Sequence, residues 1–435
     1  MLAPAIPYWQ QAGQRALQRS ANLEAVSHVT KGLEVLTALP ETRERAQQEL
    51  VLQLTLGPAL MNTRGSATPE VERVYVRACE LGRQVEDTRQ LFPALWGLWY
   101  AQMARGQLQR ARELGEELLG VARKLQDPML LLEAHRALGN TLIFLGEFGL
   151  AHTHLQEGLA MYDPQQDRSH VFRYGQDSGV TCGLFGSLCL WLLGYPDQAQ
   201  QWNEAALAHA QRLLHPFTLA QALLFSAILH QLRHEVAMGQ ERAEAQLALC
   251  AEHGFAQYLA WGTVQRGWAL AAQGQWAEGI AQIRQGFAAW RARGVGVQWL
   301  WFLALLAEAC GRTGQVEEGL RALEEALEAM QTTEDHSYDA EVYRLKGELL
   351  LQQSAEHQKE AEESLQQALA VARHQQAKSW ELRAAMSLSR LWQQQGKRAE
   401  AYQLLAPIYD WFTEGFDTAD LQEAKALLAE LGSAS

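Results

Sequence analysis

The chain has 435 residues, of which 48% are hydrophobic and 20% charged, and its formal net charge is −13. This length exceeds one ordinary globular domain unless the fold is built by repetition, and the apolar content is large enough for a core, which argues against disorder. The acidic balance argues against nucleic-acid binding, and no run of about 18 apolar residues exists, so no membrane span is expected.

The first residues, MLAPAIPYWQQAGQ, lack the basic region and apolar core of a signal peptide. The five cysteines are scattered and form no CxxC pair, so a disulfide framework is not expected. The cysteines are Cys79, Cys182, Cys189, Cys250 and Cys310. These features are typical of a protein of the reducing cytoplasm.

Helical patterns fill the chain from its first residues onward. Ala, Leu, Glu, Arg and Gln dominate, β-branched residues are sparse, and no alternating strand pattern stands out. Amphipathic stretches follow each other in pairs, as LLEAHRALGNTLIFL at 131–145 and LAHTHLQEGLAMY at 150–162 illustrate. The chain is therefore predicted to be all-α.

A short pattern recurs along the chain, in which a Gly is followed five positions later by Ala or Gly. The copies are Gly106 with Ala111, Gly146 with Ala151, Gly194 with Ala199, Gly274 with Gly279, Gly314 with Gly319 and Gly396 with Ala401. The spacings of 40, 48, 80, 40 and 82 residues indicate a period of about 40, with degraded copies near Arg233-His234 and near 354–361.

The pattern has a physical explanation. The Gly ends one helix because it takes up the left-handed cap without strain. The small residue begins the next helix and lets the two backbones approach closely where they cross. Each period is therefore predicted to be an antiparallel helix pair.

Residues Leu138-Gly139, Gly146 and Ala151 make the chain resemble the tetratricopeptide repeat, as do Trp9, Gly13 and Ala25, where Ser20 takes the turn position. The resemblance implies a right-handed superhelix of about ten helix pairs, although the period of about 40 exceeds the usual 34. The segment FTEGFDTADLQEAKALLAEL at its end is expected to form a capping helix.

The array is expected to be a single domain over residues 1–435, with N-terminal repeats at 1–161 and C-terminal repeats with the cap at 183–435. An irregular segment, 162–182, lies between them. Its Pro164 stops a helix, and Asp177 or Ser178 is a plausible N-cap for a helix over 180–193. Its three Asp residues do not match a calcium loop, so a joint is favoured over a functional loop.

Several segments also resemble the C-terminal region of large bacterial signalling proteins, in which a nucleotide cyclase or other effector precedes an AAA-type or STAND-type ATPase and a helical array. These segments lie at 8–36, 91–100, 174–177, 193–199, 343–351 and 408–428. The resemblance implies a sensor or scaffold portion, with the cyclase and ATPase portions expected upstream.

No catalytic motif stands out. The one Gly-Lys pair, Gly396-Lys397, is followed by Arg398 and is a repeat turn, so it is no phosphate loop. Neither a Gly-x-Ser-x-Gly elbow nor an HExxH motif occurs. His230 and His234 have the spacing of two metal ligands, but further ligands are missing nearby, and a polar helix face is favoured. The chain is thus expected to be no enzyme, with no cofactor and no metal.

By the pattern of the repeat family, first-helix positions line the inner, concave wall of the superhelix. The candidates on that wall are Trp96, Tyr100, Arg136, Asn140, Trp268, Trp301, Arg344 and Arg390. A groove with aromatic and arginine side chains suits a peptide or a small ligand. The alternative is a solvated inner face, or contact of the face with itself in a tight superhelix.

Arg136 is the candidate on which the binding role depends most. A basic group in an acidic protein needs either an anionic guest or an acidic neighbour, and Glu133 is close enough in sequence to be that neighbour. A buried Arg136 paired internally, with Trp96 in the core, would argue against ligand binding.

Three functions follow as hypotheses. The first is a non-catalytic scaffold that binds a peptide or protein partner in its groove as part of bacterial signalling. The second is a small-ligand sensor that controls an upstream cyclase or ATPase, and the third is an enzyme, for which no catalytic residues were found. Nucleic acid and membranes are not expected partners.

Overall fold

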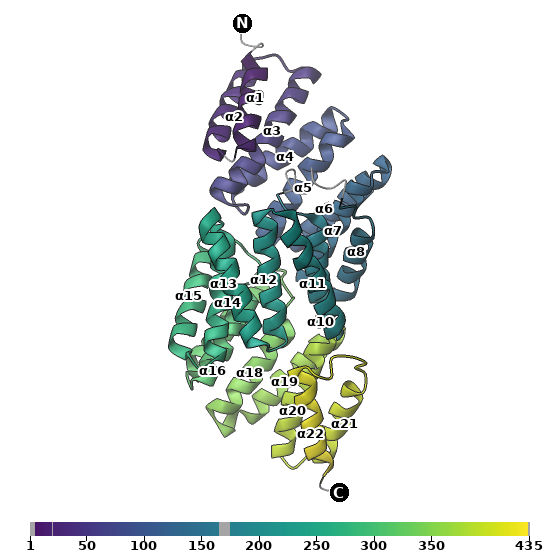
Figure 1. Cartoon of the computed structure of the whole chain (residues 1–435), viewed down its shortest axis with the longest axis vertical. Helices are drawn as coiled ribbons and strands as arrows, with labels where there is room; N and C mark the ends of the chain where they lie inside the picture. The colour runs from purple at the N-terminus through teal and green to yellow at the C-terminus, as the bar shows by residue number, and fades with distance from the viewer. Residues whose placement is uncertain (1–4, 20, 165–174, 434–435) are drawn as a thin grey trace. The chain divides into compact units, whose positions relative to one another are not determined.

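The computed structural model describes residues 5–19, 21–164 and 175–433, and within them it contains 21 α-helices and no β-strand (Figure 1). The helices follow each other as ten antiparallel pairs, and α22 comes last. The predicted all-α, tetratricopeptide-like superhelix is therefore confirmed, as is the helix at its C-terminal end.

Contacts between Cα atoms divide the chain into two units. Unit 1 comprises Met1–Thr141 and the short segment Arg291–Val297. Its helices are α1 (Ile6–Gln18), α2 (Asn22–Thr37), α3 (Arg43–Arg64), α4 (Pro69–Gln84), α5 (Thr88–Ala104), α6 (Leu108–Leu125) and most of α7 (Pro128–Phe144). First helices contact the first helices of the next pairs, α1 with α3 and α3 with α5.

Unit 2 comprises Leu142–Trp290 and Gln298–Ser435. After α8 (Phe148–Ala160) its helices are α10 (Ser178–Leu192), α11 (Pro196–Leu213), α12 (Pro216–Leu232), α13 (Val236–His253), α14 (Ala256–Ala272), α15 (Trp276–Arg291), α16 (Trp299–Arg312), α17 (Val316–Thr332), α18 (Asp339–Gln353), a short 3-10 helix η2 (Ala355–His357), α19 (Gln358–His374), α20 (Lys378–Gln394), α21 (Arg398–Tyr409) and α22 (Ala419–Gly432). From α10 to α22, each even-numbered helix contacts the next even-numbered helix.

The Gly residues of the repeat pattern are left-handed, as predicted. The φ angles of Gly106, Gly146, Gly194, Gly274, Gly314 and Gly396 lie between +74° and +91°. The degraded copy at 233–234 keeps the conformation without Gly, because His234 itself has a φ of +60°. The other degraded copy contains η2 in place of a simple turn.

The small residues of the pattern lie where two helices cross. Ala111, Ala151, Ala199 and Ala401 are completely buried. A Cβ atom added to Gly279 would lie 2.6 Å from the carbonyl oxygen of Gly267 on the preceding helix. Because real Cβ atoms do not approach a carbonyl so closely, only Gly allows the two backbones to pack at that distance.

The first helices of unit 2 are buried on nearly all sides. Every residue of α10 except Leu188 is buried. A series of ring contacts, with centroids 4.5–6.3 Å apart, begins on α10, passes along the first helices of unit 2 and ends on α10 again. Its members are Phe185, Phe225, Trp261, Trp301, Tyr338, Trp380 and Trp191. Unit 2 thus closes on itself, and aromatic side chains occupy its inner face.

A second contact closes unit 2 between residues more than 200 positions apart. One carboxylate oxygen of Glu414 accepts hydrogen bonds from the backbone amides of Asp197 and Gln198, both at 3.0 Å, in the first turn of α11. The amide of Gly415 donates to the Asp197 carboxylate, also at 3.0 Å. We call these four residues the clasp. A carboxylate at a helix N-terminus is stabilised by the helix dipole and by the free amides there.

The irregular segment at 162–182 is described only in part, since 165–174 lie outside the described residues. The predicted helix stop is confirmed because α8 ends at Ala160, before Pro164. Asp177 is the N-cap of α10, and its side chain accepts from the amide of Val180 at 2.8 Å. Asp167, one of the three Asp residues of this segment, lies outside the described residues.

Among the helices of the described residues, none combines the length and the apolar character that crossing a membrane requires.

Candidate functional site

The predicted groove residues of unit 1 come together, but in the core. The guanidinium of Arg136 lies 5.3 Å from the centre of the Trp96 ring and 5.8 Å from that of Trp99. Trp96 and Tyr100 stack at 5.5 Å, with their ring planes 7° apart. Side chains of α5 and α7 therefore lie together in unit 1.

The binding role of this cluster is not supported. Arg136 and Glu133 have no exposed surface, and Arg136 donates two hydrogen bonds to the Glu133 carboxylate, at 3.0 and 2.6 Å. The indole nitrogen of Trp96 donates to the same carboxylate at 3.1 Å, and Asn140 is buried as well. Of the two partners that the sequence left open for Arg136, the structure shows the acidic neighbour. The prediction of an open groove at Trp96, Arg136 and Asn140 is therefore wrong.

Trp268 and Trp301 are also buried, with 6% and 5% of their surface exposed. Trp301 belongs to the series of ring contacts on the inner face. Trp268 faces α13, because a Cβ atom added to Gly239 would lie 3.2 Å from its ring. Both were predicted to extend an open wall, and that prediction is wrong since unit 2 closes on itself and fills this part of the face.

Arg344 and Arg390 do line a cavity, which lies within unit 2 and has a volume of about 280 Å³. The cavity is bounded by the end of α12 and by α16, α18, α20 and α22. We call it the inner pocket. Its polar and charged lining residues are Gln231, His234, Glu308, Arg312, Tyr338, Glu341, Arg344, Glu348, Gln352, Arg383, Ser387, Arg390, Asp420 and Glu423.

Arg344 is fixed by two carboxylates of its own helix. Its guanidinium makes a bidentate contact with Glu341, at 2.8 and 2.6 Å, and a third contact with Glu348 at 2.6 Å. These residues lie three positions before and four positions after Arg344, so one helical face presents all three. Ser387 on α20 donates to Glu348 at 2.6 Å and joins α20 to this network.

Arg383 joins three elements at the pocket. It donates to Asp420 of α22 at 2.9 Å and to the carbonyl oxygen of Leu232, the last residue of α12, at 2.6 Å. Its Nη2 also lies 2.9 Å from the imidazole of His234. The guanidinium stacks 5.0–5.1 Å from the ring centres of Trp191 and Trp380. Arg383 therefore supports both the pocket and the closure of unit 2.

The pKa values of Asp420, Glu348 and Arg344 are each shifted towards the charged form. Burial alone would raise the pKa of Asp420, but Arg383 and His234 hold that pKa well below its ordinary value. Burial opposes the charge of Glu348 too, yet Arg344 and Ser387 lower the pKa of this carboxyl. For Arg344, the carboxylates of Glu341 and Glu348 outweigh burial and raise the pKa of the guanidinium well above its usual range.

Sequence reasoning missed most of this pocket. Gln231, Arg383 and Asp420 were not singled out, because they meet only when unit 2 closes. The spacing of Glu341, Arg344 and Glu348 was visible in the sequence and could have indicated an ion-paired helix face.

The two histidines with metal-ligand spacing do not share a site. His230 pairs with Glu235 at 2.5 Å, whereas His234 faces Arg383 and, at 3.6 Å, Asp420. Glu235 also accepts from Arg233 at 2.8 Å. These contacts match the polar helix end that the sequence favoured for this histidine pair.

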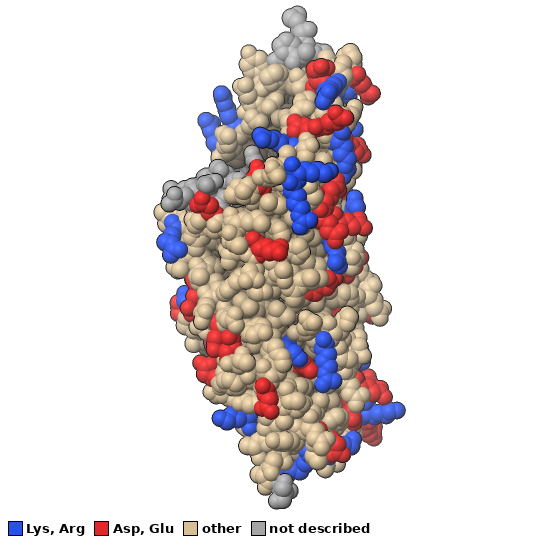
Figure 2. Space-filling view, turned by 90° about the vertical axis from the view of Figure 1, so that its right-hand side faces the viewer, with Lys and Arg blue, Asp and Glu red and all other residues tan. Residues whose placement is uncertain are grey.

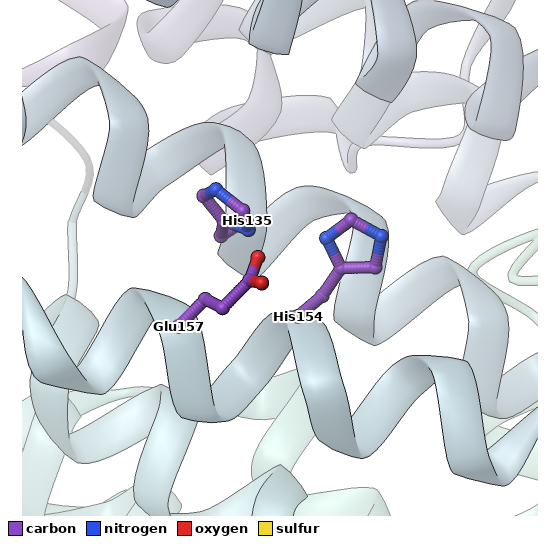
Figure 3. A group of neighbouring side chains, drawn as sticks. All are labelled: His135, His154 and Glu157. Carbon is purple, nitrogen blue, oxygen red and sulfur yellow. The ribbon is translucent and has the colours of Figure 1, made fainter.

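A further pair of candidate metal ligands occurs on α8. His154 and Glu157 lie three residues apart, so both side chains leave the same side of the helix, and Figure 3 draws them together with His135 of α7. His135 belongs to unit 1, whereas His154 and Glu157 belong to unit 2. Neither unit by itself therefore supplies all three side chains, and the absence of a metal stays a prediction.

Charges on the surface are mixed in sign. On the face in Figure 2, Lys and Arg side chains are interspersed with Asp and Glu side chains. Among the described residues, ion pairs also join charges of different helices, as Arg83 does with Glu117 at 2.7 Å and Arg390 with Glu423 at 3.0 Å. That face therefore presents no extended region of one sign.

Comparison with known proteins supports the fold. Residues 300–374 match the sequence model of the tetratricopeptide repeat. No curated protein matches the chain. The apo form of RapI is similar in structure, with 12% identity, a TM-score of 0.51, and coverage of 66% of this chain and 98% of RapI.

NprR in complex with its cognate peptide NprX is similar to the same degree. It has 10% identity and a TM-score of 0.51, and the alignment covers 78% of this chain and 96% of NprR. At these identities the likeness concerns the fold alone. Together with the repeat match at 300–374 and the paired helices, it shows that this chain has a tetratricopeptide-type helical-repeat fold.

Proposed function

We propose that the chain is a non-catalytic binding module that takes a peptide, or an extended segment of a protein partner, into the inner pocket of unit 2. The observation that carries this proposal is a polar cavity of about 280 Å³ among first helices whose faces are otherwise filled by aromatic side chains. Pockets with a few fixed polar groups in apolar surroundings are the usual binding sites of proteins. That the structurally similar NprR was solved with its cognate peptide adds support.

The ionisation of the pocket supports a non-catalytic role. General acids and bases work best when their pKa lies near the operating pH. Here the pKa values of Glu348 and Asp420 are lowered and that of Arg344 is raised, so all three pKa values are shifted away from pH 7. We therefore expect that the purified chain neither hydrolyses ATP nor forms cyclic nucleotides from ATP or GTP. Turnover that co-purifies with the chain and is absent from a Ser387→Phe preparation would contradict this.

The same pocket could instead hold a small ligand. Its volume of about 280 Å³ lies just below the range of small-molecule pockets, about 300–1,000 Å³. In this second proposal the chain is a sensor portion of a bacterial signalling system, which rests on the resemblance of segments such as 8–36 and 408–428 to the helical arrays of cyclase and ATPase proteins. A gene for a cyclase or ATPase immediately upstream would favour it.

Selection from a library of random octapeptides against the full chain tests the first proposal. Selected peptides should bind the wild-type chain and lose binding to Ser387→Phe, because the ring enters the pocket beside Glu348. Circular dichroism would check that this variant is folded. If it is not, hydrogen exchange on the wild-type chain decides, since bound peptide should protect amides of α18 and α20. Protection elsewhere, or no selected peptide, would overturn the proposal.

A further inference from the structure

Gln231 carries a polar atom that no described residue of the free protein satisfies. It lies in the last turn of α12, lines the inner pocket and is 4% exposed. Its side chain lies near that of Tyr338, and its Oε1 has no hydrogen-bond partner among the described residues. A buried acceptor without a partner lowers stability, so an apolar side chain of the same size would suit the free protein at least as well.

Arg383 offers a donor in the same pocket. Its Nε and Nη2 are used by Asp420, Leu232 and His234. Its Nη1 makes no hydrogen bond within the described part of the chain, and the carboxylate of Glu341 lies 4.0 Å from it. The guanidinium cannot swing away, because two indole rings stack at about 5 Å from it and only 7% of Arg383 is exposed. This donor is therefore held in place before a ligand arrives.

The carboxylates of the pocket leave little need for a charged ligand. Glu341 and Glu348 are bound by Arg344, and Asp420 is bound by Arg383. A ligand carboxylate or ammonium would have to displace one of these partners or stay unpaired in a buried place, which is unfavourable. A group with one donor and one acceptor, and no net charge, would meet Gln231 and Arg383 without disturbing the ion pairs.

We propose that the inner pocket recognises an uncharged amide of its ligand, which donates to Gln231 and accepts from the Nη1 of Arg383. This inference rests on the proposed peptide-binding function and specifies the chemical group of the ligand that the pocket binds. A main-chain peptide unit and the carboxamide of an Asn or Gln side chain both provide this chemistry. Gln231 is thus a ligand-contacting residue kept at some expense of stability.

The test replaces Gln231 by Met, which has a similar size and no hydrogen-bonding amide. The matched control is Gln265→Met on α14. Gln265 is 1% exposed, has no partner for either amide atom among the described residues and does not line the inner pocket. Both variants should unfold at the wild-type temperature or above it. Only Gln231→Met should weaken binding of the selected octapeptides, by about tenfold or more in Kd.

The outcomes distinguish failure of amide recognition from failure of the proposed peptide binding. If Gln231→Met binds the octapeptides as tightly as Gln265→Met while Ser387→Phe has lost them, the pocket binds peptides but the amide recognition is wrong. If no octapeptide binds, crystals of the full chain are soaked with N-methylacetamide and, separately, with acetate. N-methylacetamide within hydrogen-bonding distance of Gln231 and Arg383 would support the inference. An unchanged pocket, or acetate in that place, would overturn it.

Discussion

The buried pair of Glu133 and Arg136 should be essential to the stability of unit 1. Glu133→Ala would leave the Arg136 charge buried without its carboxylate and would free the indole N–H of Trp96, which now donates to Glu133 at 3.1 Å. Removing one partner of a buried ion pair costs about 3–5 kcal/mol. Without Glu133, the guanidinium of Arg136 would no longer be held against Trp96 and Trp99, and loss of these cation–π contacts would cost roughly 0.5–2 kcal/mol.

Replacing both partners should be far milder. In the double variant Glu133→Leu with Arg136→Met no charge remains buried, and such exchanges are often neutral. Urea unfolding followed by circular dichroism and tryptophan fluorescence would measure the free energies of unfolding. We expect Glu133→Ala to lose about 3–5 kcal/mol and the double variant to recover most of that loss. A loss below about 1 kcal/mol for Glu133→Ala would refute the reasoning, since that is typical of an exposed pair.

Three more predictions concern unfolding free energies measured in the same way. Gly274→Val should lower the free energy of unfolding by about 1 kcal/mol or more because of its φ of +87° alone, since an added Cβ atom meets nothing there. Gly146→Val should lower it further, because its Cβ atom would lie 2.4 Å from a side chain. Negligible losses in both variants would contradict the role of these residues as left-handed caps. Glu414→Ala should lower the free energy of unfolding by about 1–2 kcal/mol because it removes the hydrogen bonds of the clasp, whereas Glu400→Ala on the exposed surface should change it little. Identical effects of the two variants would contradict a stabilising role of the clasp. Since the pKa of Asp420 is lowered on folding, its stabilisation is complete above about pH 4 and is lost as the pH falls further. The advantage of the wild type over Asp420→Asn should therefore narrow below about pH 4, and an advantage that grows there would contradict the sign.

The repeat could be read from the sequence because its physical requirements are local. A left-handed cap needs Gly, and a close helix crossing needs Ala or Gly five positions later, so Gly274 and Gly279 reveal both features directly. The N-cap at Asp177 follows from the same kind of local rule. Glu133, three residues before Arg136, likewise offered the partner that the structure shows.

The open groove could not be judged in this way. Whether Trp301 faces solvent or core depends on contacts between α10 and α20, which are more than 180 residues apart, as the hydrogen bond from Ser379 to the carbonyl of Trp191 illustrates. Local periodicity carries no information about such closure. One sequence signal was available: residues 178–192 are apolar or small all around, which is typical of a helix buried on every side.

The central claim is that the inner pocket of unit 2 is where this chain binds its partner. A crystal structure of the full chain with a selected octapeptide tests it most directly. The account predicts peptide density in the pocket, against α18 and α20, with an amide of the peptide between Gln231 and Arg383. Peptide density on another surface, with the inner pocket unchanged, would contradict it.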